Sequence, residues 1–124
     1  MSLNIPILMY HQVSHEPHPN YREYTVTTQA FATQMKILRA LRFVPITFSQ
    51  LLDYKEKRTN LPNKSVIITF DDAMQDVMDN AVPILKDSGF PAVFYIPTDY
   101  VGRKSSWMIP EVNVEFQVTD WATI

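Results

Sequence analysis

Two adjacent carboxylates, Asp71 and Asp72, are the residues of this chain best suited to chemistry. They directly follow residues 65–70, an apolar run rich in β-branched and aromatic residues that predicts a short buried strand. In α/β proteins, ligands bind at the carboxyl ends of strands. Neighbouring strand residues point to opposite faces, so both carboxylates address one site only where the backbone turns at the strand end. One carboxylate could then hold a cation while the other accepts a proton. Asp72 could instead cap the following helix, because Asp is a favoured N-cap residue.

Three histidines follow the first apolar stretch of the chain, residues 5–10. His11 and His15 have the His-x-x-x-His spacing of many metal sites, and His18 comes close behind. Side chains four positions apart share one face only on a helix, and the prolines among residues 11–24 predict a loop instead. We therefore expect His15 and His18 to be loop residues. His11 remains a candidate for chemistry, or else a residue that hydrogen-bonds a nearby backbone group.

The elements that must position these residues alternate between strand and helix. Apolar runs predict buried strands at residues 5–10, 65–70 and 92–96, and a short strand at residues 43–46 that Pro45 assigns to a sheet edge or a strand end. Helical spacing of apolar residues, with caps at Thr27 or Thr28 and after Thr47, predicts helices over residues 28–41, 48–58 and 74–86. Without any hairpin signal, this order favours a parallel sheet built from βα units. We expect Pro83 to kink or break the third helix and Gly89 to end it.

The later part of the chain shows a weaker pattern. Residues 112–118 alternate like a half-buried edge strand, and residues 119–121 are typical of a helix start.

One stretch resembles the NodB-type polysaccharide deacetylases, carbohydrate esterase family 4. The motif is Val-Ile-Ile-Thr-Phe-Asp-Asp-Ala at residues 66–73, and it continues with Asp76, Asn80-Ala81, Pro83-Ile84-Leu85, Gly89-Phe90-Pro91-Ala92 and Phe94-Tyr95-Ile96-Pro97-Thr98. Family members carry Thr-Phe-Asp-Asp-Gly at a strand end, then a helix, then a strand that ends in Pro-Thr. The match covers about residues 5–121. Ala73 stands where the family usually has Gly, which predicts a tighter backbone at this point.

The resemblance implies a distorted (β/α) barrel and the metal-assisted removal of acetyl groups from an acetylated glycan. The metal would be a divalent cation, most often Zn²⁺, that polarises the acetyl carbonyl and activates a water molecule. The family completes its metal site with a His-x-x-x-His motif that has no counterpart here. We therefore expect residues 1–124 to be a single domain that supplies only the first half of the barrel, without activity by itself.

By position in the motif, Asp71 corresponds to the catalytic base of the family and Asp72 to its metal-binding aspartate. The sequence Leu-Met-Tyr-His-Gln-Val at residues 8–13 is similar to the subgroup that deacetylates poly-N-acetylglucosamine. There the histidine, here His11, is the general acid for the leaving amine, a role that suits an imidazole.

Three further side chains could contact the sugar. Thr98 follows a predicted strand end, and Tyr100 and Trp107 could stack on sugar rings. The simpler alternative is a turn residue and two aromatic residues packed against the core.

Composition limits the other function classes. A chain of 124 residues with 46% hydrophobic residues and a net charge of −2 fits one globular domain and gives no electrostatic case for nucleic acid. No apolar run is long enough to span a bilayer, and no secretory leader is expected, although members of this family are often secreted or attached to the cell envelope. An unclosed barrel would expose strand edges, so we expect self-association or binding of the missing half, with residues 112–118 as the pairing segment.

Two alternatives remain open. One is a catalytically dead fragment or a carbohydrate-binding module that keeps the first half of the fold. The other is a receiver-like phospho-acceptor domain, in which adjacent acids bind Mg²⁺. That fold places its acidic pair after the first strand, whereas here the pair follows the third predicted strand.

Overall fold

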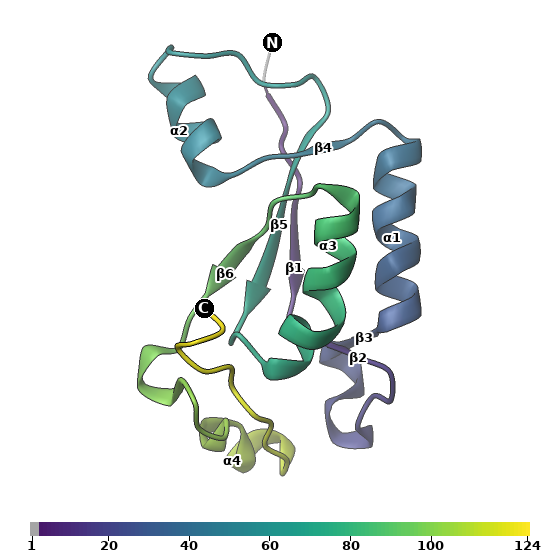
Figure 1. Cartoon of the computed structure of the whole chain (residues 1–124), viewed down its shortest axis with the longest axis vertical. Helices are drawn as coiled ribbons and strands as arrows, with labels where there is room; N and C mark the ends of the chain where they lie inside the picture. Colours follow the sequence, from purple (N-terminus) through teal and green to yellow (C-terminus); the bar gives the residue numbers. More distant parts are fainter. Residues whose placement is uncertain (1–2) are drawn as a thin grey trace.

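The computed structural model describes residues 3–124 and is built around β5 (Ser65–Asp71), whose first six residues are all buried. β5 is the centre of a four-stranded sheet with β1 (Ile7–Tyr10), β4 (Val44–Pro45) and β6 (Val93–Tyr95), and every pairing is parallel (Figure 1). β1 and β6 both pair with Phe70, so they flank β5 on opposite sides. The predicted α/β class with a parallel sheet is confirmed.

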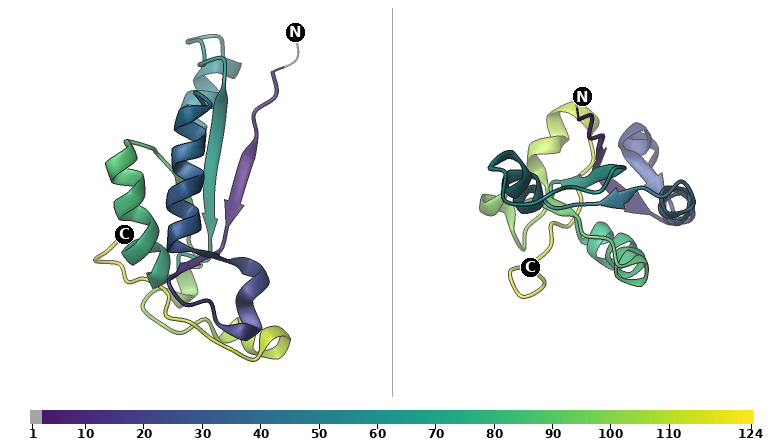
Figure 2. Two further views of the ribbon diagram at one scale, coloured as in Figure 1. Left: turned by 90° about the vertical axis from the view of Figure 1, so that its right-hand side faces the viewer. Right: turned by 90° about the horizontal axis from the view of Figure 1, so that it is seen from above.

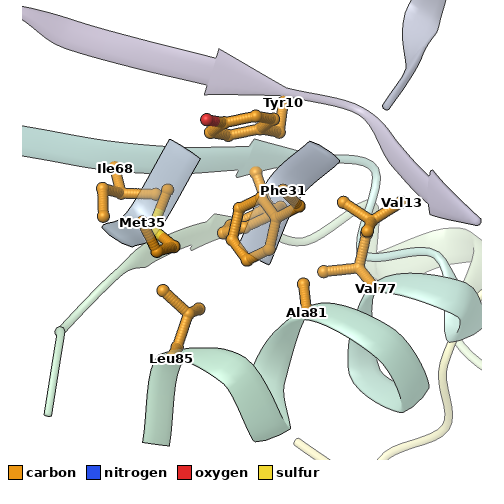
Figure 3. Packing of buried hydrophobic residues seen from close by; sticks show 9 residues of the cluster. Tyr10, Val13, Phe31, Met35, Ile68, Val77, Ala81 and Leu85 are labelled. Carbon is orange, nitrogen blue, oxygen red and sulfur yellow. The ribbon is translucent and has the colours of Figure 1, made fainter. Parts of the chain in front are cut away.

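Two helices cover one face of this sheet. α1 (Thr28–Ala40) and α3 (Val82–Ser88) lie on the same side of the strands (Figures 1 and 2). Between sheet and helices lies the main core, made by buried side chains that include Tyr10, Phe31 and Ile68 (Figure 3). None of the helices within residues 3–124 is long and apolar enough to cross a bilayer.

The opposite face of the sheet is open along its two outer strands. Ile7 and Met9 of β1 are 57% and 65% exposed, and Tyr95 of β6 is 51% exposed. The strands predicted to be buried at residues 5–10 and 92–96 are therefore only half-buried, because helices cover the sheet on one side alone.

Local sequence signals explain where the helices begin and end. The Thr27 hydroxyl accepts a hydrogen bond from the amide of Ala30 at the start of α1. α2 (Phe48–Lys55) starts with a capping box formed by Thr47 and Gln50. Both caps agree with the sequence prediction.

The helix that follows the acidic pair changes its geometry along its length. A π-helical turn, η2 (Val77–Ala81), runs directly into α3, which has Pro83 in its first turn. The predicted irregularity is thus present as a wide turn before the proline, because the proline ring excludes the ordinary i−4 hydrogen bond.

The prediction of a loop over residues 11–24 is wrong. The prolines of residues 11–24 do not exclude a helix: Pro19 opens a short 3₁₀ helix, η1 (Pro19–Tyr24), since proline is tolerated in a first helical turn. This helix lies between two short strands that pair in parallel, β2 (Gln12–Ser14) and β3 (Thr25–Thr27).

The predicted edge strand at residues 112–118 is also wrong. After the short helices η3 (Thr98–Tyr100), η4 (Ser106–Met108) and α4 (Ile109–Val112), the chain makes only isolated bridges. These join Lys104 to Gln117 and Met74 to Val118, and Val118 is fully buried. The segment returns into the body of the domain and closes over the carboxyl ends of the strands (Figure 1). Beyond it, the predicted helix start at residues 119–121 is a turn, in which the Asp120 carboxylate accepts hydrogen bonds from Thr123.

Two helix ends with the same hydrogen bonds give a matched test of backbone strain. After α3, Gly89 has a left-handed φ of 67°, and Phe90 N–H donates to the Leu85 carbonyl. After α1, Arg42 has φ 64°, and Phe43 N–H donates to the Leu38 carbonyl. A Cβ at Gly89 would meet no atom within 4 Å, so only the backbone conformation opposes a side chain there.

We expect Gly89→Ala to lower the free energy of unfolding by about 1 kcal/mol, the usual cost of a left-handed non-glycine residue. Arg42→Gly should raise it by a smaller amount, because relief of strain is partly offset by the greater entropy of the unfolded chain. Urea titration followed by circular dichroism measures both changes. Shifts of the same sign in the two variants would contradict the assignment.

Candidate functional site

The turn that leaves β5 gives the acidic pair its geometry. Asp71 ends the strand, and the next two residues, Asp72 and Ala73, have left-handed φ angles of 73° and 46°. The turn is held from outside, because Thr119 N–H donates to the Ala73 carbonyl at 2.9 Å. Glycine adopts such angles without strain, so Ala73 occupies a backbone position where glycine would cost less. Asp72 lies outside the N-cap position of the following helix and lines a cavity, so the helix-cap interpretation of Asp72 is wrong.

His11 and Asp71 lie side by side. His11 links β1 to β2, and β1 is the strand next to β5, so both side chains emerge at the carboxyl end of the sheet. The His11 Nε2 atom is 3.4 Å from Asp71 Oδ2, and both side chains are partly exposed, at 22% and 30%. The expected placement of His11 at the same end as the acidic pair is confirmed. The distance allows an ion pair whenever the imidazole is protonated.

A cavity of about 230 Å³ opens beside this pair. Its walls come from four separate segments of the chain: His11, Tyr21, Tyr24, Asp72, Trp107, Met108, Glu111 and Val112. The ring centroids of His11 and Tyr24 are 5.7 Å apart, and those of Tyr21 and Tyr24 are 5.1 Å apart. Aromatic walls around a few polar groups are typical of a small-molecule or sugar site.

The surroundings of this cavity disfavour the charged forms of Asp72 and Tyr21. Loss of solvent raises the pKa of Asp72 above its usual range, the nearby His11 lowers it, and the charge of Asp71 raises it. Burial also raises the pKa of the Tyr21 hydroxyl, and the charges of Asp72, Tyr24 and Asp71 raise it further. A bound cation or a proton at Asp72 would therefore relieve an unfavourable charge.

The other predicted residues divide between two places. Trp107 lines the cavity with His11 and Asp72. Thr98 and Tyr100 line a separate open hollow of about 820 Å³, although the Tyr100 ring contacts Trp107 edge to face at a centroid distance of 4.6 Å. The structure thus brings Trp107 to the acidic pair and leaves Thr98 and Tyr100 away from it.

The remaining histidines do not join the site. His15 is exposed, and His18 Nδ1 accepts a hydrogen bond from the amide of Asn20. Within residues 3–124 no three His, Cys, Asp or Glu side chains gather closely enough to hold a metal ion.

Sequence reasoning missed five cavity residues: Tyr21, Tyr24, Met108, Glu111 and Val112. Tyr21 has a φ of −126° and a ψ of 16°, which are not helical and mark a kink within residues 19–24, so helical spacing alone does not indicate that Tyr21 and Tyr24 share one wall. No signal in the sequence distinguishes Glu111 from other surface acids.

The sequence of the chain is similar to those of known proteins. Residues 58–119 match the family model described as polysaccharide deacetylase. The chain is similar to poly-beta-1,6-N-acetyl-D-glucosamine N-deacetylases of Staphylococcus epidermidis, 38% identical over 81 residues, and of Staphylococcus aureus, 36% identical over 84 residues. These alignments cover 65% and 68% of the chain and 28% and 29% of the relatives' own lengths.

Solved structures agree over nearly the whole chain. IcaB from Ammonifex degensii matches with a TM-score of 0.79 and 30% identity, over 98% of this chain and 47% of that one. A de-N-acetylase from Aggregatibacter actinomycetemcomitans has the same fold over 96% of the chain, with a TM-score of 0.77 and 22% identity. The chain thus spans about half of these structures and less than a third of the curated relatives. The family model alone covers half of the residues, among them both aspartates, and the chain belongs to the polysaccharide deacetylase family.

Proposed function

We propose that this chain carries the proton-transfer half of a polysaccharide deacetylase site that hydrolyses the N-acetyl groups of a poly-N-acetylglucosamine-like glycan. Members of the family are hydrolases, and membership removes the receiver-like alternative. The observation that carries the proposal is the pairing of His11 Nε2 with Asp71 Oδ2, at 3.4 Å, beside an aromatic cavity. The staphylococcal relatives are poly-beta-1,6-N-acetyl-D-glucosamine N-deacetylases, which supports this substrate class.

The reaction needs two proton transfers, one from the attacking water and one to the departing nitrogen. A water oxygen attacks the acetyl carbonyl, the carbon–nitrogen bond breaks, and acetate and a free amine are released. Asp71 is the base that accepts the proton of the water, and His11 is the acid that donates a proton to the departing nitrogen. Because the two side chains are in near contact, one can serve the attacking water and the other the departing nitrogen of the same acetamido group. Trp107 and Tyr24 then form the walls against which the sugar ring packs.

The family resemblance also implies a divalent metal, Zn²⁺ in the first instance, with Asp72 as a ligand. Catalytic zinc sites use three protein ligands, and the described residues hold no group of three. The donors of this chain therefore do not form such a site by themselves, and we expect the chain alone to bind Zn²⁺ or Co²⁺ weakly. When bound, the metal would supply Lewis-acid polarisation of the carbonyl.

The first test measures acetate release from N-acetylglucosamine oligomers by a protein that joins this chain to the remaining half of the fold. Asp71→Asn should lower the rate by about 10²- to 10⁴-fold, the usual contribution of a general base. Zn²⁺ affinity measured by calorimetry should stay close to that of the parent, whereas the matched variant Asp72→Asn should lose it. Loss of metal affinity in Asp71→Asn would mean that the two aspartates have the opposite roles. A parent protein that binds the oligomer without releasing acetate would favour the binding-module alternative.

A second test uses the pKa of Asp72. Its folded pKa is raised above the ordinary value of 3.8, so its stabilising contribution is fully present below pH 3.8 and is lost as the pH rises through the folded pKa. Asp72→Asn removes this charge and keeps a residue type that tolerates a left-handed φ. The free energy of unfolding of Asp72→Asn minus that of the parent should therefore increase between pH 4 and pH 7.

Urea titrations with a chelator present, at several pH values, give this difference. The control is Asp99→Asn, at an exposed carboxylate, which should leave the pH dependence unchanged. A pH-independent difference for Asp72→Asn would show that its charge carries no cost in the folded chain.

We also propose that the sheet is part of a distorted (β/α) barrel. The matching structures are about twice as long, and helices cover only one face of the sheet (Figure 2), so the other face would line the interior of such a barrel. β1 and β6 each pair with β5 alone, and their exposed side chains include Ile7, Met9 and Tyr95. Unpaired strand edges beside apolar side chains recruit other chains, so the chain alone should self-associate through β1 and β6.

Light scattering coupled to size exclusion tests this expectation. Met9→Lys should shift the chain toward the monomer, because it places a charge on the open face. Leu52→Lys changes a comparably exposed apolar residue on α2, 53% exposed against 65% for Met9, and should leave association unchanged. A parent chain that elutes as a single monomer and unfolds cooperatively would contradict the proposal.

A further inference from the structure

The main sheet holds the backbone before His11 but not the backbone after it. Before it, β1 pairs with β5 through four residues in register. After it, β2 pairs only with β3, and neither strand belongs to the main sheet. The backbone that follows His11 must therefore be fixed by contacts other than the main sheet if the imidazole is to stay against Asp71.

Two side-chain hydrogen bonds supply that attachment. The Gln12 Nε2 group donates to Asp76 Oδ2 at 2.7 Å, and the Asn80 Nδ2 group donates to the Val13 carbonyl at 2.9 Å. Asp76 and Asn80 lie on the helical segment that directly follows the acidic pair. The apolar side chain of Val13 is fully buried and points toward Val77 of the same segment (Figure 3).

The Gln12 amide is buried, with 2% of the residue exposed, and both of its ends have partners. Its Nε2 group meets a carboxylate, which only accepts, and its Oε1 atom lies 2.9 Å from the Thr25 hydroxyl, whose single proton is shared with the Tyr21 carbonyl at 2.7 Å. These partners allow one orientation of the amide. Loss of either partner leaves a buried polar atom unsatisfied, which costs about 1–3 kcal/mol. The amide therefore ties the residue after His11 to the element after Asp71 and Asp72 in a single arrangement.

We infer that Asp76 is a positioning residue that acts through the buried amide of Gln12 to hold the His11 imidazole against Asp71. Neither residue lines the cavity beside the acidic pair, so the effect is on the placement of the imidazole and not on contact with substrate. The inference rests on the proposed function only for what the His11–Asp71 pair does; the geometry of the pair can be measured without catalysis.

The chain contains its own matched control. Gln75 Nε2 donates to Asp79 Oδ1 at 2.9 Å, which is the same kind of amide–carboxylate hydrogen bond, close by in the sequence. Asp79 is exposed, and its partner is not part of β2. Asp76→Ala and Asp79→Ala therefore remove the same chemical interaction, once with and once without the link to His11.

The experiment records the imidazole signals of the three histidines by NMR in the whole chain at one pH, with a chelator present. In the parent, His11 should show a nuclear Overhauser effect to the Tyr24 ring, and Asp71→Asn should shift the His11 signals. In Asp76→Ala, the contact with Tyr24 should weaken, and adding Asp71→Asn should produce little further shift. In Asp79→Ala, both effects should match the parent, and His15 and His18 serve as internal references throughout.

A second variant guards against simple unfolding. Thr25→Val removes the hydroxyl that contacts both Gln12 Oε1 and the Tyr21 carbonyl, and it keeps a β-branched residue in β3, so the His11 signals should move in the same direction by a smaller amount. The inference is overturned if a folded Asp76→Ala chain keeps the parent His11 signals and their response to Asp71→Asn. It is also overturned if Asp79→Ala changes them equally, or, should Asp76→Ala not fold, if Thr25→Val leaves them unchanged.

Discussion

The backbone leaves β5 through two consecutive left-handed residues, and the site depends on this turn. A straight continuation would send Asp71 and Asp72 to opposite faces of the sheet. Asp71 lies beside His11 at the end of the strand, and the φ angles of 73° at Asp72 and 46° at Ala73 turn the chain so that Asp72 lines the aromatic cavity. Left-handed angles at residues with a Cβ cost roughly 1–2 kcal/mol each. The hydrogen bond from Thr119 to Ala73 and the bridge from Met74 to Val118 hold the turn against that cost.

The same turn explains the electrostatics of the site. It places one carboxylate at the partly exposed strand end and the other in a half-buried cavity beside tyrosine rings. Two adjacent acids thus experience different environments, and desolvation raises the pKa of Asp72. A cation or a proton bound at Asp72 would remove this unfavourable charge.

Much of the fold could be predicted because it follows from short-range rules. Thr27, Thr47 and Gly89 mark helix ends by their own side-chain or backbone chemistry, and the apolar run of β5 marks the central strand. The order of strands and helices then gives a parallel sheet. The identities of Asp71 and His11 at strand ends were enough to predict that they share one end of that sheet.

The remaining features depend on contacts between distant segments. Residues 112–118 alternate as an edge strand would, yet they fold over the turn of the acidic pair, and nothing local indicates that partner. Pro19 begins a helix where prolines in a polar stretch favour a loop, so Tyr21 and Tyr24 were not recognised as cavity residues. Glu111 reaches the cavity because α4 lies beyond the carboxyl ends of the strands (Figure 1).

The long separation between β1 and β5 has a consequence for how the chain folds. Leu8 and Thr69, joined by a hydrogen bond from the threonine hydroxyl, are 61 positions apart. Closing a loop of that length must precede most of the stabilising contacts, so parallel pairings of this kind form slowly. During synthesis, β1 leaves the ribosome before β5 has been made, so the apolar side chains of β1 stay exposed to solvent until β5 follows. His11 directly follows β1 and Asp71 ends β5, so the imidazole and the carboxylate come together only once these two strands have paired.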